Sequence, residues 1–187
     1  MQLDELKTRL NLLPPLADPH LPDNAYPAAV MMPVLPTAQG LTLILTRRSR
    51  HLRHHPGQVC FPGGRVDSTD MSLWEAALRE SFEEIGLLPE QCQLLAQLQA
   101  QHTISDFALT PFVGLVQGEV NFKLNPGEVD ELFQVPLEYL LEVRHHHLFT
   151  VNRKGLPQQV VFIRWHNTWI WGITAAIIHQ LARQIAR

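Results

Sequence analysis

The chain has 187 residues, with 15 Lys and Arg against 18 Asp and Glu, which gives a formal net charge of −3. That length suits one domain with a sizeable core, and the slightly negative charge disfavours a nucleic-acid binder. Hydrophobic residues make up 45% of the chain and charged residues 18%, which excludes an intrinsically disordered protein.

The N-terminal segment predicts a short amphipathic helix, because leucines follow Leu3 at i+3 and i+7. It contains acidic residues and no long apolar run, unlike an export signal. Residues 14–27 are rich in proline and polar residues and predict a loop. We expect a single domain over residues 1–187, in which residues 1–27 form a peripheral extension.

The rest of the chain alternates predicted strands with predicted helices. Apolar runs predict strands over residues 28–35, 41–47, 92–99, 111–117 and 158–165. Helical periodicity predicts helices over residues 72–87, 136–142 and 169–185. A loop with a short strand at 58–61 fills residues 48–71. Interleaved strands and helices indicate an α/β or α+β fold.

Two observations favour a soluble cytoplasmic protein. The most apolar stretch, Trp169–Ile178, has ten residues, whereas a membrane span needs about 20. The two cysteines, Cys60 and Cys92, lack CxxC spacing, which excludes a disulfide framework and suits a reducing compartment. We therefore expect no membrane partner, and a homo-oligomer stays open.

The long loop over residues 48–71 has the composition of a functional segment. Gly63 and Gly64 carry no Cβ, so the backbone there can lie close to a ligand. Upstream lies an arginine run, which we define as Arg47, Arg48, Arg50 and Arg53. A guanidinium group binds two phosphate oxygens at once, so we expect one or two of these arginines to bind an anionic substrate.

The segment Ala77–Leu87 places three carboxylates on one face of the predicted helix. At 100° per residue, Glu80, Glu83 and Glu84 fall within a sector of about 100°. The opposite side, which we expect to pack against the core, carries four large apolar residues: Trp74, Leu78, Phe82 and Ile85. Gly86 is suited to end the helix.

The three carboxylates have two interpretations. Like charges at this spacing destabilise a bare helix, and a divalent cation removes the penalty, since Mg²⁺ prefers oxygen ligands from one or two carboxylates, phosphates and water. A solvated acidic helix face explains the same pattern. The Gly-Gly loop upstream, Arg79 beside Glu80, and Gly86 after the glutamates favour the metal site.

This combination resembles the sequence box of the Nudix hydrolase superfamily. The part from Arg79 to Leu87 is intact, except that Ser81 stands where the family has an apolar residue. Asp70 stands where Glu is usual, with one extra residue before Arg79. Asp70 and the extra residue before Arg79 are similar to the coenzyme A pyrophosphatase branch, as are three further features: Asp67, the segment Leu45–Asp70 and the segment Trp171–Ala175.

The resemblance implies a Nudix-type α/β/α sandwich with a mixed, partly antiparallel sheet and a catalytic loop and helix. It implies metal-dependent hydrolysis of the diphosphate bond of coenzyme A or a derivative. The products are then 3′,5′-ADP and 4′-phosphopantetheine, and the cofactor is Mg²⁺ or Mn²⁺.

The same resemblance implies roles for residues of this chain. Glu80 and Glu84 become metal ligands, and Glu83 becomes a third ligand or the base that activates water. The Gly63 carbonyl is a further metal contact, and Arg79 pairs with a carboxylate of the box and orients it. The expected substrate-binding residues are Arg47, Arg50, Arg53 and Gly64.

Other interpretations stay open. The box builds a metal site and leaves the leaving group undefined, so ADP-ribose, NADH or a nucleoside triphosphate is an alternative substrate. A non-catalytic nucleotide-binding regulator is a further alternative, disfavoured because Glu80, Glu83 and Glu84 are all present.

Several residues outside the box carry weaker patterns. Glu128 or Glu131 is a second candidate for the base or for another metal ligand. The histidines at 145–147 are expected to have surface or packing roles, and Cys60 to be a small buried hydrophobic residue without an activating partner. We expect three aromatic residues in the core: Trp165, Trp169 and Trp171.

Overall fold

A computed structural model of the protein describes residues 1–12, 21–153 and 155–185. The helices are α1 (Leu3–Asn11), α2 (Leu73–Ile85), α3 (Leu137–Leu141) and α4 (Ile173–Ile185), with short 3-10 helices η1 (Pro89–Gln91) and η2 (Val143–His145). The strands are β1 (Tyr26–Thr37), β2 (Gly40–Arg48), β3 (Val59–Cys60), β4 (Gly63–Arg65), β5 (Cys92–Gln97), β6 (Gln101–His102), β7 (Phe107–Val116), β8 (Val129–Pro136), β9 (His146–Arg153), β10 (Leu156–Trp165) and β11 (Thr168–Trp171).

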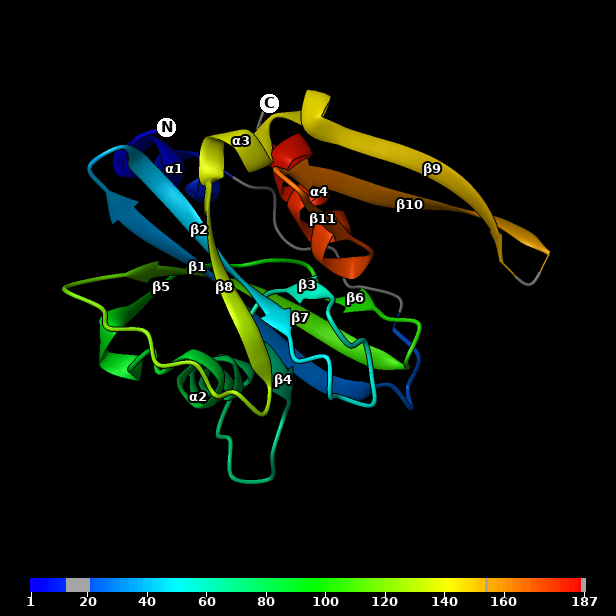
Figure 1. The fold of residues 1–187 in the computed structure, drawn as a ribbon, viewed down its shortest axis with the longest axis horizontal. Helices are drawn as coiled ribbons and strands as arrows, with labels where there is room; N and C mark the ends of the chain where they lie inside the picture. The colour runs from blue at the N-terminus through cyan, green and yellow to red at the C-terminus, as the bar shows by residue number, and fades with distance from the viewer. Residues whose placement is uncertain (13–20, 154, 186–187) are drawn as a thin grey trace.

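Among the described residues, eight strands form one mixed sheet at the centre of the molecule (Figure 1). Its central path runs β3-β2-β1-β7-β5, while β4 pairs with β1, β6 with β7 and β8 with β2. Strands β1 and β7 are parallel, with Tyr26 opposite Phe107, and their other neighbours pair antiparallel. The expected mixed, partly antiparallel sheet is confirmed.

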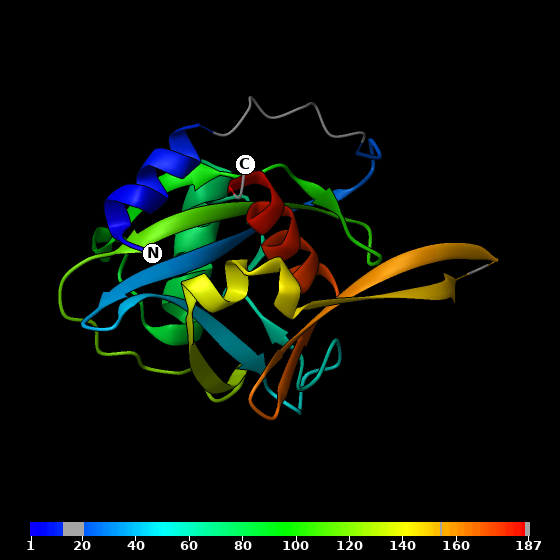
Figure 2. The ribbon, with the colours of Figure 1, turned by 90° about the horizontal axis from the view of Figure 1, so that it is seen from above.

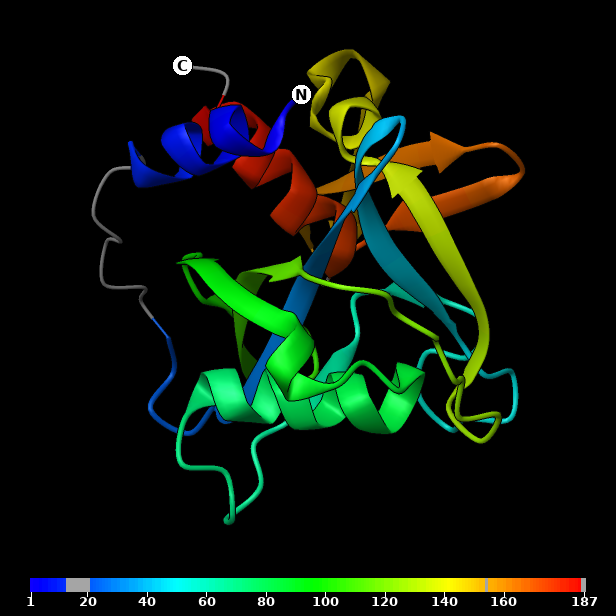
Figure 3. The same cartoon turned by 90° about the vertical axis from the view of Figure 1, so that its left-hand side faces the viewer.

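Helices cover both faces of this sheet, with α2 on one face and α1 and α4 on the other (Figure 3). Strand β1 explains the two layers, because successive side chains of a strand point to opposite faces. Val30 and Met32 join the core beneath α1 and α4, whereas Ala29 and Met31 join the core beneath α2. The uninterrupted apolar run of β1 therefore belongs to a strand buried on both sides.

A smaller antiparallel sheet, β11-β10-β9, carries a hairpin that extends away from the main body (Figure 2). In β11, Ile170 is buried, but Trp169 and Trp171 point to the other face and are 45% and 42% exposed. Our expectation of core positions for these two tryptophans was wrong, because alternation along a strand outweighs their apolar character. Trp165, by contrast, is partly buried against the core.

The C-terminal helix begins later than predicted. Residues 168–171 form β11, and Gly172, with a φ of 69°, separates this strand from α4. The expected loop over residues 14–27 lies partly outside the described residues, and its end joins β1. None of the helices in the described part of the chain is long and apolar enough to cross a bilayer.

Candidate active site

Helix α2 has well-defined ends. The Ser72 hydroxyl accepts a hydrogen bond of 3.1 Å from the Glu75 N–H, which caps the first turn. At the other end Gly86 has a φ of 69°, and its N–H donates to the Phe82 carbonyl at 2.9 Å. The predicted end of the helix at Gly86 is confirmed. Glu80, Glu83 and Glu84 therefore all lie in the second half of α2.

The orientation of α2 differs from the expectation. Glu84 is only 4% exposed, whereas Phe82 is 48% exposed, so Phe82 does not pack against the core as predicted. The buried side is centred on Ala77 and Ser81, whose short side chains let the helix approach the sheet. Burial therefore reaches the edge of the acidic face and includes Glu84.

The two glycines of β4 make room for the acidic face. A Cβ added at Gly64 would lie 2.5 Å from the Glu80 carboxyl carbon, and one at Gly63 would lie 2.4 Å from the Ala29 carbonyl oxygen. Gly63 also has a φ of 147°, which an L side chain rarely adopts. The backbone at Gly64 is therefore closely approached by the Glu80 carboxylate, whereas the expected approach to a ligand stays a prediction.

Arg79 connects the loop to the helix through charged hydrogen bonds. It binds the Asp70 carboxylate with two nitrogens at 2.9 and 3.0 Å, and it donates to Glu80 at 3.0 Å and to Glu83 at 3.1 Å. These bonds with Arg79 lower the pKa of Asp70. The predicted pairing of Arg79 with carboxylates of the box is confirmed, and Asp70 anchors the guanidinium from the other side.

Glu84 is the most perturbed carboxyl group of the site. Burial, followed by the negative charge of Glu80, raises its pKa from 4.5 to about 8. A backbone hydrogen bond from Gly63 and the positive charge of Arg48 act in the opposite direction. The Oε2 atom of Glu84 is buried without a hydrogen-bond partner, so the site contains a carboxylate oxygen that lacks a ligand.

The described residues contain no group of three His, Cys, Asp or Glu side chains gathered closely enough to hold a metal ion on their own. Mg²⁺, however, commonly takes one or two carboxylates and completes its shell with phosphate and water. The unpartnered Glu84 oxygen and the Glu80 carboxylate beside Gly64 fit that pattern. Burial raises the pKa of Glu80 as well, and a cation would relieve this cost. The residues present therefore fit a divalent ion.

The structure separates the two downstream glutamates. The charge of Glu128 raises the pKa of both Glu80 and Glu84, so Glu128 lies near the box. Glu131 instead accepts a hydrogen bond of 3.1 Å from Arg47. Of the two downstream glutamates, Glu128 therefore lies nearer to the carboxylates of the box.

The four arginines of the arginine run lie in different environments. Arg47 donates to Glu131, to Thr168 at 2.9 Å and to the Gly57 carbonyl at 3.2 Å. Arg50 and Arg53 are exposed in the loop that follows β2. Arg48 lies beside Glu84, as its effect on the Glu84 pKa shows.

Among the described residues, neither Cys60 nor His146 has a catalytic arrangement. Burial raises the pKa of the Cys60 thiol to about 11, so it stays protonated near neutral pH. His146 is buried, with Nε2 at 2.8 Å from the Leu140 carbonyl and Nδ1 at 2.8 Å from Nδ1 of His179. The carbonyl only accepts, so Nε2 of His146 donates and its Nδ1 accepts from His179. The predicted packing role fits this histidine.

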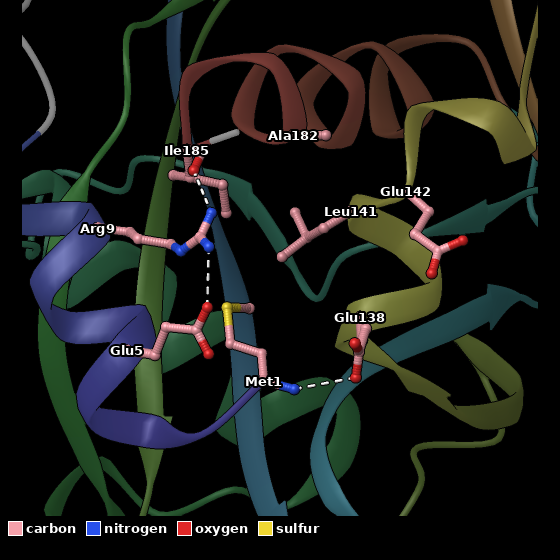
Figure 4. A pocket seen from close by; sticks show the side chains of 8 residues that line it. All are labelled: Met1, Glu5, Arg9, Glu138, Leu141, Glu142, Ala182 and Ile185. Carbon is pink, nitrogen blue, oxygen red and sulfur yellow. Dashed lines mark hydrogen bonds and ion pairs between the residues drawn. The ribbon is translucent and has the colours of Figure 1, made fainter. Parts of the chain in front are cut away.

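A cavity of about 170 Å³ lies between α1, α3 and α4, on the side of the sheet opposite α2 (Figure 4). Ion pairs within the chain satisfy its charges: the Met1 amine lies 2.9 Å from Glu138, and Arg9 lies 2.9 Å from Glu5. Arg9 also donates to the Ile185 carbonyl at 2.6 Å. These contacts connect α1 with α3 and α4, and the cavity is separate from the carboxylates of α2.

Comparisons with known proteins match the part of the chain that contains β4 and α2. A model of the NUDIX domain family matches residues 25–159. A Pectobacterium atrosepticum protein named as an uncharacterized Nudix hydrolase NudL is 42% identical over 187 residues, which cover 98% of this chain and 95% of its own. A protein of the same name from Photorhabdus laumondii is 40% identical over 185 residues, which cover 99% and 98% of the two chains.

Solved structures share the fold. A crystal structure of a Deinococcus radiodurans protein has a TM-score of 0.55 at 19% identity and covers 88% of each chain. The Ap4A hydrolase of C. elegans, solved as a binary complex, has a TM-score of 0.52 at 20% identity and covers 59% of this chain and 80% of its own. At these identities the likeness establishes the arrangement of sheet and helices.

Proposed function

The chain belongs to the Nudix hydrolase family and is a pyrophosphohydrolase, and we propose that its substrate is coenzyme A or a derivative. Water and the diphosphate linkage are the reactants. One phosphoanhydride bond breaks, and the products are 3′,5′-ADP and 4′-phosphopantetheine. The choice of substrate rests on the similarity of residues 45–70 and 171–175 to the coenzyme A pyrophosphatase branch.

The observation that carries the proposed chemistry is the buried, unpartnered Oε2 of Glu84 beside the carboxylate of Glu80. We propose these two residues as the metal ligands, with Glu83 as a third ligand or the base and the Gly63 carbonyl as a further contact. Bound Mg²⁺ or Mn²⁺ neutralises charge on a diphosphate and lowers the pKa of a coordinated water. Glu128 is the alternative base, because it is near the box.

Arg79 has a positioning role in this proposal. Its bonds to Asp70 fix the guanidinium, which in turn fixes the carboxylates of Glu80 and Glu83. These ion pairs orient the carboxylates of Glu80 and Glu83 before a cation binds. Gly64 contributes by leaving space for Glu80, and because it carries no Cβ its backbone can lie against the substrate.

We propose that Arg50 and Arg53 bind the 3′-phosphate of coenzyme A. Both are exposed in the loop after β2, whereas Arg47 is already bonded to three groups of the protein. Each charge-assisted hydrogen bond to a phosphate contributes about 1.5–3 kcal/mol. Replacing the critical arginine with alanine therefore raises KM about tenfold or more and changes kcat less.

A substrate panel tests the proposal. Purified protein is incubated with Mg²⁺ and coenzyme A, dephospho-coenzyme A, ADP-ribose or NADH, and products are identified by mass. We expect the highest kcat/KM for coenzyme A, a lower value for dephospho-coenzyme A, and loss of this preference in Arg50→Ala or Arg53→Ala. Equal use of both coenzymes refutes recognition of the 3′-phosphate, and a preference for ADP-ribose or NADH refutes the substrate.

A further inference from the structure

Two buried atoms of opposite charge, one at the end of β2 and one on α2, lack hydrogen-bond partners. Among the described residues, Nε of Arg48 and Oε2 of Glu84 are both buried with no hydrogen-bond partner. Buried polar groups almost always have a partner, and a buried charge is costly unless it is paired. A single unpartnered atom can be satisfied by one ligand atom. Two unpartnered atoms of opposite charge are satisfied together by a ligand that has both a cationic and an anionic part.

The backbone fixes Arg48 between two loops. Its N–H donates to the Gln58 carbonyl at 2.9 Å, and its carbonyl accepts from the Gly57 N–H at 3.0 Å. The next residue, Ser49, donates to the Glu128 carbonyl at 2.8 Å. Arg48 is therefore held by the segment that leads to Gly63 on one side and by the segment of Glu128 on the other.

The side chains of Arg47 and Arg48, at the end of β2, point in different directions. Successive side chains of a strand alternate, and an irregularity in the β2–β8 register falls between Arg47 and Arg48. Arg47 bonds to Glu131 and Thr168. The Arg48 guanidinium instead lies near the Cys60 thiol and the Glu84 carboxylate, because its positive charge lowers the pKa of both groups. Of the arginine run, Arg48 is thus the member placed beside the box.

The charges around Arg48 determine which ligand fits. Glu80, Glu84 and Glu128 influence one another electrostatically, and Arg48 is the cation that offsets Glu84 from the side of β2. An anion alone would be repelled by three carboxylates. An anion bound together with a divalent cation would satisfy both unpartnered atoms. Glu84 Oε2 would coordinate the cation, and an oxygen of the anion would accept a hydrogen bond from Arg48 Nε.

We propose that Arg48 binds the diphosphate group itself. Its Nε–H would donate a hydrogen bond to a phosphate oxygen, and a divalent cation held by Glu84 would neutralise charge on the same group. This inference rests on the proposed function and deepens it, because it assigns an arginine to the reacting group rather than to the 3′-phosphate. Arg48 is then a substrate-binding residue close to the bond that breaks. Its guanidinium plane suits phosphate better than an ammonium group does.

Binding measurements separate this role from that of a counter-ion. The first probe is Mn²⁺ alone, whose binding is measured by electron paramagnetic resonance. The second probe is methylenediphosphonate, which cannot be hydrolysed and is titrated calorimetrically in the presence of Mn²⁺. Wild type is compared with Arg48→Gln, Arg48→Lys and Arg164→Gln. Arg164 is exposed on the small sheet, so the last variant controls for the loss of one positive charge.

We expect Arg48→Gln to bind methylenediphosphonate about tenfold more weakly or worse, a loss of about 1.4 kcal/mol or more. Its affinity for Mn²⁺ alone should be unchanged or higher, because a nearby positive charge has been removed. Arg48→Lys keeps the charge beside Glu84 and should recover part of the affinity. Arg164→Gln should match wild type, and circular dichroism should confirm that each variant is folded.

Two results overturn the inference. Unchanged methylenediphosphonate binding in Arg48→Gln makes Arg48 a counter-ion of Glu84, and parallel loss of Mn²⁺ and methylenediphosphonate makes it a support for the metal ligands. The proposed function fails separately. If wild type cleaves no member of the coenzyme panel while methylenediphosphonate still binds through Arg48, the substrate is wrong and this inference stands.

Discussion

Replacing Glu84 with Gln separates the charge of the site from its shape, because the two side chains have nearly the same size. In the metal-free protein the folded-state pKa of about 8 exceeds 4.5, the ordinary value. Between these pH values the folded protein holds a proton that the unfolded chain has lost. The contribution of Glu84 to the free energy of unfolding therefore falls as pH rises from about 4.5 to 8, and it levels off above that.

The size of this effect follows from the pKa shift. One pKa unit corresponds to about 1.4 kcal/mol, so the shift of Glu84 sets an upper bound of roughly 5 kcal/mol. Water entry and relaxation around a buried charge reduce the cost, and we expect on the order of 3 kcal/mol. Glu84→Gln should thus be as stable as wild type at pH 5 and more stable by that amount at pH 9.

Urea unfolding in EDTA at pH 5, 7 and 9 measures the difference. Glu83→Gln is the matched control, because the Glu83 side chain is 49% exposed and its ion pair with Arg79 is a surface interaction. Its pH profile should run parallel to that of wild type. Parallel profiles for wild type and Glu84→Gln would refute the reasoning, because they would mean that Glu84 is not a buried charge in the metal-free protein.

The same substitution should remove function while it stabilises the fold. Loss of one ligand charge should reduce turnover by on the order of 10²-fold, comparable to loss of an electrostatic stabiliser. Mg²⁺ should raise the melting temperature of wild type more than that of Glu84→Gln. Full activity of the variant at saturating Mg²⁺ would remove Glu84 from the proposed ligands.

Three further predictions concern other parts of the molecule. Gly64→Ala places a Cβ against the Glu80 carboxylate, so kcat/KM should fall at least about tenfold; wild-type kinetics would contradict the close approach. Excess EDTA should abolish turnover and added Mg²⁺ restore it, and full activity in EDTA would contradict a metal-dependent reaction. Burial lowers the pKa of both His146 and His179, so the unfolded chain binds more protons and stability is lost as pH falls below about 6.5. His179→Gln keeps a hydrogen-bond donor and should lose less stability between pH 7 and 5 in urea titrations; an unchanged slope would count against the pair.

Local chemistry made much of the fold predictable. The apolar run of β1 and the ends of α2 follow from side-chain alternation and from Gly86, which act within a few residues. The Nudix box likewise places its residues within one loop and one helix, so their proximity needs no tertiary information. Strand β8 lacks a long apolar run and has Asp130, Glu131 and Gln134 within it, and its pairing with β2 was not predictable from its own residues.

Tertiary packing decided what the sequence left open. On the helical wheel we took the side with large apolar residues as the side that packs against the core. That choice predicted Phe82 to be buried and Glu84 to be exposed. The small residues Ala77 and Ser81, with the glycines of β4, reverse that orientation. The choice between Glu128 and Glu131 depended equally on the register of β8 against β2, because Arg47 lies opposite Glu131.

The parallel pairing of β1 and β7 has a consequence for how the enzyme is made. Val30 pairs with Gly63 on one side of β1 and with Pro111 on the other, and α2 lies between these partners in the chain. During synthesis the N-terminal part emerges first, so the complete Nudix box leaves the ribosome before β7 has emerged. Because pairings between distant segments form slowly, the nascent chain carries every proposed metal ligand before it can hold them in place. Catalytic competence is thus acquired in a late step of folding, although the residues responsible for it are synthesised early.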